Sequence, residues 1–104
     1  MCGRFTLTAD AEELAEYFAL PAVFELSTPR YNIAPTQPIA VVREGRCAKR
    51  HLDFLRWGLI PHWARDQSIG ARLINARAET VHKKRSFAAA FSRRRCIVAA
   101  DGFY

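Results

Sequence analysis

Residues 10–20 carry the clearest helical pattern of apolar and polar positions in the chain. Three apolar residues lie on one face at helical spacing: Leu14, Tyr17 and Phe18. Asp10 is suited to the N-cap, Glu13 stands where a capping box has its second member, and Pro21 cannot continue a helix. The pattern therefore predicts a helix that begins at Asp10 and ends at Leu20.

Shorter apolar runs in the middle of the chain are typical of strands and loops. Residues 39–43 and 46–55 predict a hairpin with its turn at Glu44-Gly45. Residues 57–63 begin and end with a tryptophan, and the five residues between them include a glycine and a proline. This pattern predicts an aromatic loop. Residues 71–81 are expected to be extended or irregular.

The C-terminal part of the sequence predicts a short helix and then a strand. Residues 86–92 place two phenylalanines four positions apart on one helical face. Residues 96–100 are apolar and predict a buried strand, and Asp101-Gly102 predicts a turn. Only two aromatic residues follow, which leaves the predicted sheet edge without a partner, and folded proteins avoid such edges. We therefore expect a truncated chain, or one whose missing part is supplied elsewhere.

Length and cysteine content limit the class of protein. The 104 residues suit one small domain, and no apolar run approaches the roughly 20 residues that span a bilayer. Cys2, Cys47 and Cys96 are an odd number and lie far apart, so a disulfide scaffold is not expected. These features favour a cytoplasmic protein, associated with the nucleoid if the source is bacterial.

The charge of the chain is concentrated in its second half. There are 16 Lys and Arg against 10 Asp and Glu, a net charge of +6. Residues 1–52 hold six of each sign, so residues 53–104 supply the whole excess. Much of it lies in Lys83-Lys84-Arg85 and Arg93-Arg94-Arg95. A basic half with interleaved aromatic residues favours a nucleic acid partner, and the alternative is a basic face that is only solvated.

Several polar residues are candidates for a site, each with a structural alternative. Cys47 and His51 fall on the same face of a predicted strand, but no second pair completes a zinc site, so no metal or other cofactor is expected. Trp57 and Trp63 suit a core and a base-stacking surface equally well. The stretch Asn75–Thr80 offers groups for a carbonyl and a phosphate, although a polar turn accounts for it more simply.

Cys2 carries the most distinctive chemistry in the chain. Removal of Met1 leaves an α-amine and a thiol on adjacent carbons, and the neutral amine and the ionised thiol are both nucleophiles. Such an aminothiol condenses with an aldehyde, because the amine forms a Schiff base and the thiol then closes a thiazolidine ring. The alternative is an incidental cysteine near a chain end.

Five segments resemble, in order and at compatible spacing, the SOS-response-associated peptidase (SRAP) family. They are Met1–Phe5, Arg30–Pro35, Trp57–Trp63, Ile74–Thr80 and Arg95–Tyr104. The resemblance implies an α+β fold in which curled, largely antiparallel sheets and short flanking helices surround a basic cleft containing Cys2. Residues 1–104 would form the N-terminal portion of this single domain.

The resemblance also implies a function in the DNA damage response. Members of the family sense abasic sites in single-stranded DNA, and the N-terminal cysteine forms a thiazolidine with the ring-opened deoxyribose. This lyase-like chemistry gives a covalent DNA–protein crosslink. Cys2 would be the nucleophile and Asn75 would position the reacting groups, while Arg4 and Arg77 would hold flanking phosphates. Weaker candidates for lining the DNA path are Asn32, Trp63 and Arg85.

The chain departs from the family pattern at its end. The family has an acid–base Glu directly after Gly-Phe-Tyr and a catalytic His farther on, whereas this sequence ends at Tyr104 and none of its histidines matches. General acid–base groups contribute about 10²–10⁴-fold in rate, so we expect crosslinking by this chain to be slow or absent. Met1 must also be removed. The family name refers to proteolysis, such as self-removal of Met1, but no residue here indicates peptide-bond chemistry.

The expected partner is therefore single-stranded DNA with abasic sites, with no membrane, and the full-length protein is expected to be a monomer. Two other classes stay open. In an N-terminal-nucleophile amidohydrolase or peptidase, the Cys2 thiolate attacks an amide and its amine acts as the base. A noncatalytic module that binds single-stranded nucleic acid would be sensitive to salt and indifferent to Cys2.

Overall fold

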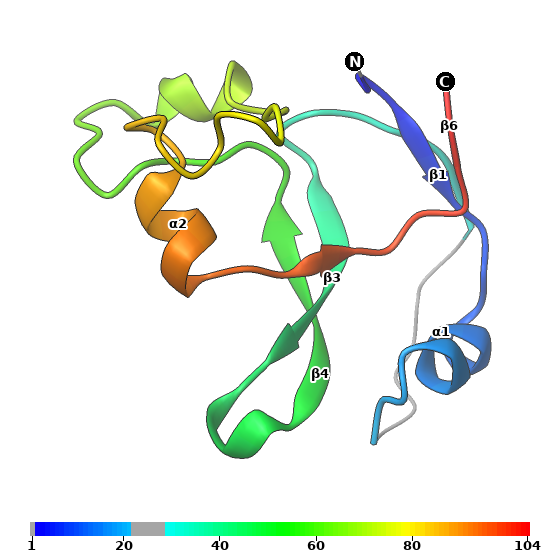
Figure 1. Ribbon diagram of the computed structural model, residues 1–104. Coiled ribbons are helices and arrows are strands. Elements are labelled where there is room, and N and C mark those ends of the chain that lie inside the picture. Colours follow the sequence, from blue (N-terminus) through cyan, green and yellow to red (C-terminus); the bar gives the residue numbers. More distant parts are fainter. Residues whose placement is uncertain (1, 22–28) are drawn as a thin grey trace.

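Two antiparallel sheets and a few short helices form the fold in the computed structural model, which describes residues 2–21 and 29–104 (Figure 1). The strands are β1 (Phe5–Leu7), β2 (Arg30–Ile33), β3 (Pro38–Glu44), β4 (Arg50–Arg56), β5 (Ile97–Val98) and β6 (Gly102–Phe103). The helices are α1 (Ala11–Tyr17) and α2 (Ala88–Arg93), with 3₁₀ turns η1 (Arg46–Ala48) and η2 (Gln67–Ala71). Within the described residues the strand orders are β2-β1-β6 and β4-β3-β5. The predicted α+β class with antiparallel sheets is confirmed.

Helix α1 begins as the sequence predicts and ends earlier. The Asp10 side chain accepts a hydrogen bond from the Glu13 backbone N–H at 2.9 Å, which is the geometry of an N-cap. The helix ends at Tyr17 rather than Leu20, because Ala19 adopts a left-handed conformation with φ of 55°.

The β3–β4 hairpin has a longer connection than the sequence predicts. β4 begins at Arg50 instead of residue 46, because Cys47 and Ala48 both have positive φ and form the turn η1. The Gly45 N–H donates to the Lys49 carbonyl at 2.9 Å and closes the loop. β3 lies between β4 and β5, and its residues 39–42 are all buried. A central strand covered on both faces explains this uninterrupted apolar run.

The C-terminal segment differs most from the sequence prediction. Residues 96–100 are not a buried strand, because β5 has only two residues, with Ile97 54% and Val98 45% exposed. Asp101 and Gly102 do not form a terminal turn. A bend at Asp101 instead carries the chain from β5 into β6, which pairs with β1 at Phe5 and Thr6. The segment 97–103 thus links the two sheets (Figure 1).

The connection between β4 and β5 is largely irregular, as predicted, apart from two helical segments. The turn η2 lies in a region where no helix is predicted. Helix α2 begins at Ala88, two residues later than predicted, and Phe87 is its N-cap residue. This connection forms the loops above α2 in Figure 1.

One apolar core joins both sheets and α1. Its buried members are Phe5, Leu7, Leu14, Ile33, Ile39, Ala40, Val41 and Ala99. Cys2 and Trp57 are partly buried and pack against this cluster. Cys2 is therefore held against the core rather than extended into solvent.

Asp101 fastens the C-terminal segment to the N-terminal one. Its carboxylate accepts hydrogen bonds from the Thr6 hydroxyl at 2.7 Å, the Thr8 N–H at 2.6 Å and hydroxyl at 2.9 Å, and the Ala9 N–H at 2.9 Å. Desolvation opposes ionisation, but these hydrogen bonds outweigh it and lower the pKa of Asp101 from 3.8 to about 2.

Gly58 and Gly70 bring two parts of the long connection into close backbone contact. Gly58 has a φ of 129°, which side chains with a Cβ rarely adopt. A Cβ at Gly58 would lie 2.3 Å from the Gly70 carbonyl oxygen. This contact requires glycine at position 58.

We expect Asp101→Asn to lower the free energy of unfolding by about 1 kcal/mol at neutral pH, because the amide retains one acceptor oxygen instead of two. The depressed pKa makes the contribution of Asp101 complete above its unfolded value of 3.8 and progressively lost as the pH falls toward about 2. Thermal unfolding followed by circular dichroism between pH 2 and 7 checks this. Asp53→Asn, which removes one exposed ion pair with Arg43, is the matched control. Equal losses for both variants would contradict the role of Asp101.

We expect Gly58→Ala to destabilise the fold by about 2 kcal/mol or more, because it combines an unfavourable φ with a backbone clash. Gly3→Ala is the control, since nothing lies within 4 Å of a Cβ at Gly3. Urea denaturation of both variants measures the difference. A Gly58→Ala variant as stable as the wild type would show that the contact with Gly70 is not required.

Candidate functional site

Cys2 and Asn75 are in direct contact although they are far apart in the sequence. The Asn75 side-chain amide donates a hydrogen bond to the Cys2 backbone carbonyl at 2.7 Å. The Cys2 thiol lies 3.4 Å from the Arg4 carbonyl oxygen. Both Cys2 and Asn75 are half-buried. The contact holds the backbone of Cys2 in place, and the residue stays partly buried against the apolar core.

Trp57 determines where Asn75 lies. Its indole N–H donates to the Ile74 carbonyl at 2.9 Å, and its ring packs edge-on against Phe5 with centroids 5.2 Å apart. The Leu59 N–H also donates to the Leu73 carbonyl at 3.0 Å. Of the two alternatives for Trp57, the structure supports the core one. The residues before Asn75 are thereby tied to β1, which follows Cys2.

A cavity with a volume of about 350 Å³ opens beside this pair. Its lining residues are Cys2, Phe5, Ile39, Trp57, Ile74, Asn75, Val98, Ala100 and Phe103. Apart from Cys2 and Asn75 these side chains are apolar, and none is Lys or Arg. The cleft around Cys2 was expected to be basic, but its walls at this point are apolar. The arginines of the chain lie outside this lining.

Arg4 and Asn32, two predicted DNA contacts, form a second pair. The Arg4 guanidinium donates to the Asn32 side-chain oxygen at 3.0 Å, and both residues are exposed. Asn32 belongs to β2, the neighbour of β1. The Tyr104 hydroxyl also donates to the Tyr31 carbonyl at 2.6 Å, which ties the C-terminus to β2.

Trp63 and Arg85 form a third pair in the long connection. The guanidinium carbon of Arg85 lies 4.2 Å from the centre of a Trp63 ring, a cation–π contact. The Trp63 indole N–H is buried and has no hydrogen-bond partner among the residues that the structure describes. Arg77 lies two residues beyond Asn75, in an exposed turn where its carbonyl accepts from the Thr80 and Val81 N–H groups.

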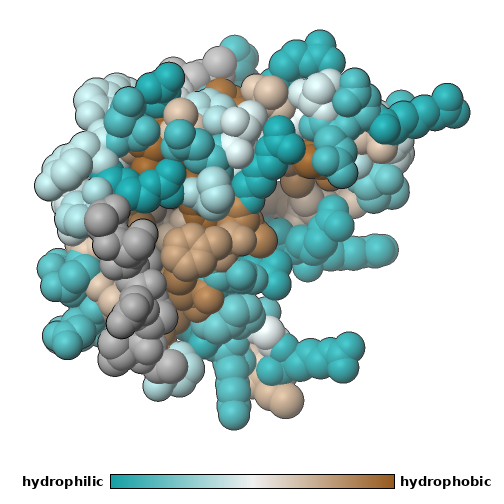
Figure 2. Space-filling model, turned by 180° about the vertical axis from the view of Figure 1, so that it is seen from behind, coloured by the Kyte–Doolittle hydropathy of each residue, from teal (hydrophilic) through white to brown (hydrophobic). Residues whose placement is uncertain are grey.

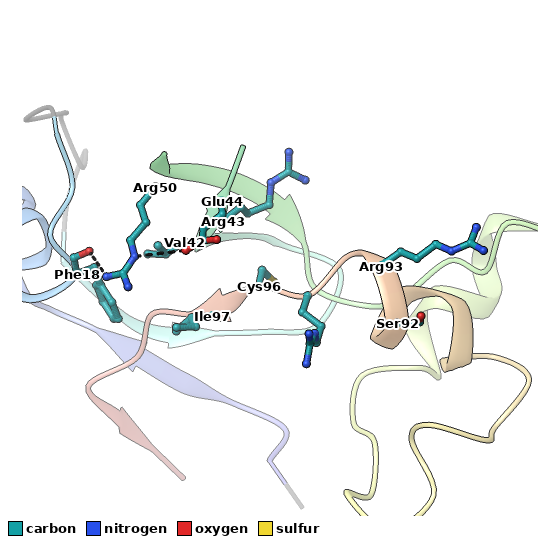
Figure 3. A pocket seen from close by; sticks show the side chains of 10 residues that line it. Phe18, Val42, Arg43, Glu44, Arg50, Ser92, Arg93, Cys96 and Ile97 are labelled. Carbon is teal, nitrogen blue, oxygen red and sulfur yellow. Dashed lines mark hydrogen bonds and ion pairs between the residues drawn. The ribbon is translucent and has the colours of Figure 1, made fainter. Parts of the chain in front are cut away.

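A larger cavity of about 520 Å³ collects arginines that the sequence did not assign to a site (Figure 3). Its lining residues are Phe18, Val42, Arg43, Glu44, Arg50, Ser92, Arg93, Arg95, Cys96 and Ile97. Arg50 donates to the Phe18 carbonyl at 3.0 Å and lies 3.9 Å from the Glu44 carboxylate. Burial raises the pKa of the Cys96 thiol, and Arg43 opposes this shift. In the sequence, only the basic triplet at 93–95 indicated an arginine-rich surface here. The arginines that β3 and β4 add to the cavity could not be predicted, because their positions depend on the fold.

The prediction that Cys47 and His51 lie on the same face of one strand is wrong, because Cys47 lies in the turn η1 and His51 in β4. Among the residues that the structure describes, no three His, Cys, Asp or Glu side chains converge as a metal site requires. Within the same residues no helix is long and apolar enough to cross a membrane.

Comparison with known proteins identifies relatives over the whole chain. The family described as SOS response associated peptidase (SRAP) matches residues 1–104. Abasic site processing protein YoaM of Bacillus subtilis is 44% identical over 107 residues, which cover 100% of this chain and 46% of YoaM. Abasic site processing protein HMCES of Pongo abelii is 33% identical over an alignment of 87 residues, and the match covers 73% of this chain and 25% of that protein.

A solved structure agrees with the sequence relationship. A crystal structure of a protein from Bordetella bronchiseptica superimposes with a TM-score of 0.76 at 28% identity, covering 99% of this chain and 50% of the other. The chain thus spans about half the length of the bacterial relatives that it matches. The match over residues 1–104 establishes that this chain belongs to the SRAP family.

Proposed function

We propose that this chain carries the nucleophile of an abasic-site processing protein. After removal of Met1, the Cys2 amine adds to the ring-opened aldehyde of an abasic deoxyribose and releases water to give a Schiff base. The thiol sulfur then bonds to the same carbon, and its proton ends on the nitrogen, which closes a thiazolidine. The product is a covalent link between the protein and single-stranded DNA.

The contact between Asn75 and Cys2 is the observation that carries this proposal. A neutral amide that donates to the Cys2 carbonyl holds the residue without consuming its amine or its thiol. Fixing both groups beside a bound aldehyde would make the condensation effectively unimolecular, and such orientation reaches effective molarities of about 10⁵–10⁸ M in favourable cases.

Noncovalent contacts would bring the DNA strand to Cys2. Arg4, whose guanidinium is exposed beside Asn32, and the exposed Arg77, two residues beyond Asn75 in the sequence, would bind phosphates on either side of the lesion. The Trp63–Arg85 pair would line the strand farther away and offer a flat surface for an unpaired base. The names of YoaM and HMCES, both abasic site processing proteins, support this substrate.

Proton transfer is the step of the reaction that the residues around Cys2 would assist least. No carboxylate and no imidazole lies in the described lining of the Cys2 cavity. Solvent would therefore have to exchange protons with the amine, the aldehyde oxygen and the thiol. Without a positioned acid–base group the reaction is expected to be slower by about 10²–10⁴-fold than with one.

The direct test mixes Met1-processed protein with a single-stranded oligonucleotide that contains one abasic site. We expect a heat-stable shifted band, formed slowly, and no band with Cys2→Ala, because that variant has no thiol to close the ring. Cys47→Ala is the matched control, because Cys47 is exposed and lies in η1, outside the lining of the Cys2 cavity. Intact mass spectrometry must first show that Met1 is absent.

The result separates the proposal from the two other classes. Equal shifting of abasic and intact DNA that persists in Cys2→Ala and is lost at high salt would indicate a noncatalytic binding module. Release of product from an amide substrate without any crosslink would indicate an amidohydrolase. Either result would overturn the crosslinking proposal.

We expect Asn75→Leu to increase the rate at which iodoacetamide alkylates Cys2 by several-fold, because the Cys2 backbone loses its anchor. The exposed Cys47 serves as an internal reference in the same sample, and peptide mass mapping measures both rates. The same variant should slow crosslinking by about 10-fold or more, since the reacting groups are less well oriented. An unchanged ratio of Cys2 to Cys47 alkylation would mean that Asn75 does not hold Cys2.

A further inference from the structure

The cavity beside Cys2 has apolar walls. Among the residues that the structure describes, nine line it, and seven of these have apolar side chains. Three of the seven are aromatic: Phe5, Trp57 and Phe103. Phe5 and Ile39 are also buried members of the core, each 5% exposed. One wall of the cavity is therefore the apolar core itself.

The polar groups at this cavity already have partners within the protein. The Asn75 side-chain amide donates to the Cys2 carbonyl at 2.7 Å, and the Trp57 indole N–H donates to the Ile74 carbonyl at 2.9 Å. The described lining contains no Lys, Arg or His. A charged ligand would therefore lose its water here without gaining an ion pair from a lining side chain, which is costly. An uncharged apolar ligand would instead gain from leaving water.

The volume of the cavity, about 350 Å³, suits a small ligand. Ligand cavities in proteins span about 300–1,000 Å³, and an apolar cavity of about 150 Å³ is enough to bind benzene. A single substituted aromatic ring therefore fits. Figure 2 shows that on one face of the molecule apolar groups gather in a central hollow that hydrophilic side chains surround. On that face an apolar molecule finds its contacts in the hollow.

Cys2 adds a reactive group to the lining of this cavity. After removal of Met1, its amine adds to an aldehyde and releases water to give a Schiff base. The thiol sulfur then bonds to the same carbon, and its proton ends on the nitrogen. Neither step involves a phosphate or a nucleobase. The covalent bonds hold the aldehyde carbon, and the apolar walls are left to contact the rest of the molecule.

We propose that the Cys2 cavity captures small, uncharged apolar aldehydes that are not part of DNA and converts them to thiazolidines on Cys2. The lining favours such aldehydes over charged ones of equal size, because it offers apolar contact and no ion pair. This inference rests on the proposed chemistry of Cys2, and it adds a class of substrate that needs no contact with phosphates.

The first experiment compares two aldehydes of matched shape, 4-methylbenzaldehyde and 4-carboxybenzaldehyde. Intact mass spectrometry follows how fast Met1-processed protein gains the mass of each aldehyde less one water. The peptide Cys-Gly-Arg-Phe, identical to residues 2–5, gives the intrinsic rates of the same aminothiol without the cavity. We expect the ratio of the methyl to the carboxy rate to be at least about tenfold higher on the protein. Equal ratios on protein and peptide would overturn the proposal.

Val98→Arg tests whether the lining causes this preference. Val98 lines the cavity and is 45% exposed, so a longer side chain has room at the surface. We expect the ratio to fall toward that of the peptide, because the guanidinium attracts the carboxylate and makes the wall polar. Phe54→Arg is the matched control, since Phe54 is 50% exposed on β4 and lies outside the lining. Equal ratios in the two variants would contradict the assignment to this cavity.

A competitor provides a second measurement that does not depend on the folding of Val98→Arg. Benzyl alcohol has an aromatic ring and no carbonyl group, so it can occupy the cavity without reacting with Cys2. It should slow the reaction of 4-methylbenzaldehyde with the protein and leave the reaction with the peptide unchanged. A protein rate that benzyl alcohol does not lower would show that the cavity does not bind an apolar ring.

The outcomes also separate this inference from the proposed function. Peptide mapping must place the adduct on Cys2, and an adduct on a lysine alone would overturn the inference. A crosslink to abasic DNA without the preference for the methyl aldehyde would overturn the inference and leave the proposed function intact. The preference without a crosslink to abasic DNA would support the inference and overturn the proposed function.

Discussion

β1 pairs with β2 along one edge and with β6 along the other, and the rest of the structure depends on this pairing. It joins the first residues of the chain to the last, and the Asp101 carboxylate reinforces it through hydrogen bonds to Thr6, Thr8 and Ala9. β1 is only three residues long, so its own ladder provides few hydrogen bonds. The buried Phe5 and Leu7 and this carboxylate together keep Cys2 against the core.

The position of Cys2 follows from two separate constraints. β1 fixes the chain direction after it, and Asn75 fixes its carbonyl from a loop that Trp57 ties to the core. Because these constraints come from different segments, neither the amine nor the thiol is needed to hold the residue. Under the proposed function, this arrangement would leave the N-terminal aminothiol free to react, and the apolar cavity beside it would receive the sugar aldehyde.

The cavity beside Cys2 and the arginine-rich cavity differ in the chemistry of their walls. The walls around Cys2 are apolar, whereas the arginines of β3, β4 and the segment after α2 surround a different cavity that shares none of its lining residues. The segment 97–103 borders both cavities, because Ile97 lines the arginine-rich one and Val98 and Phe103 line the one beside Cys2.

The sequence by itself determined the features that depend on local chemistry. The N-cap at Asp10, the apolar run of β3 and the aromatic loop at 57–63 follow from residues within a few positions of one another, and five ordered motifs identified the family. Tertiary structure alone decided the long turn at Cys47, the exposure of β5 and the crossing of the chain at Asp101 into the other sheet. It also decided that Trp57 supports the core and that Asn75 contacts Cys2 across 73 positions in the sequence. The physical reason is that propensity and periodicity describe neighbouring residues, whereas burial and strand pairing depend on which distant segments compete for the same core.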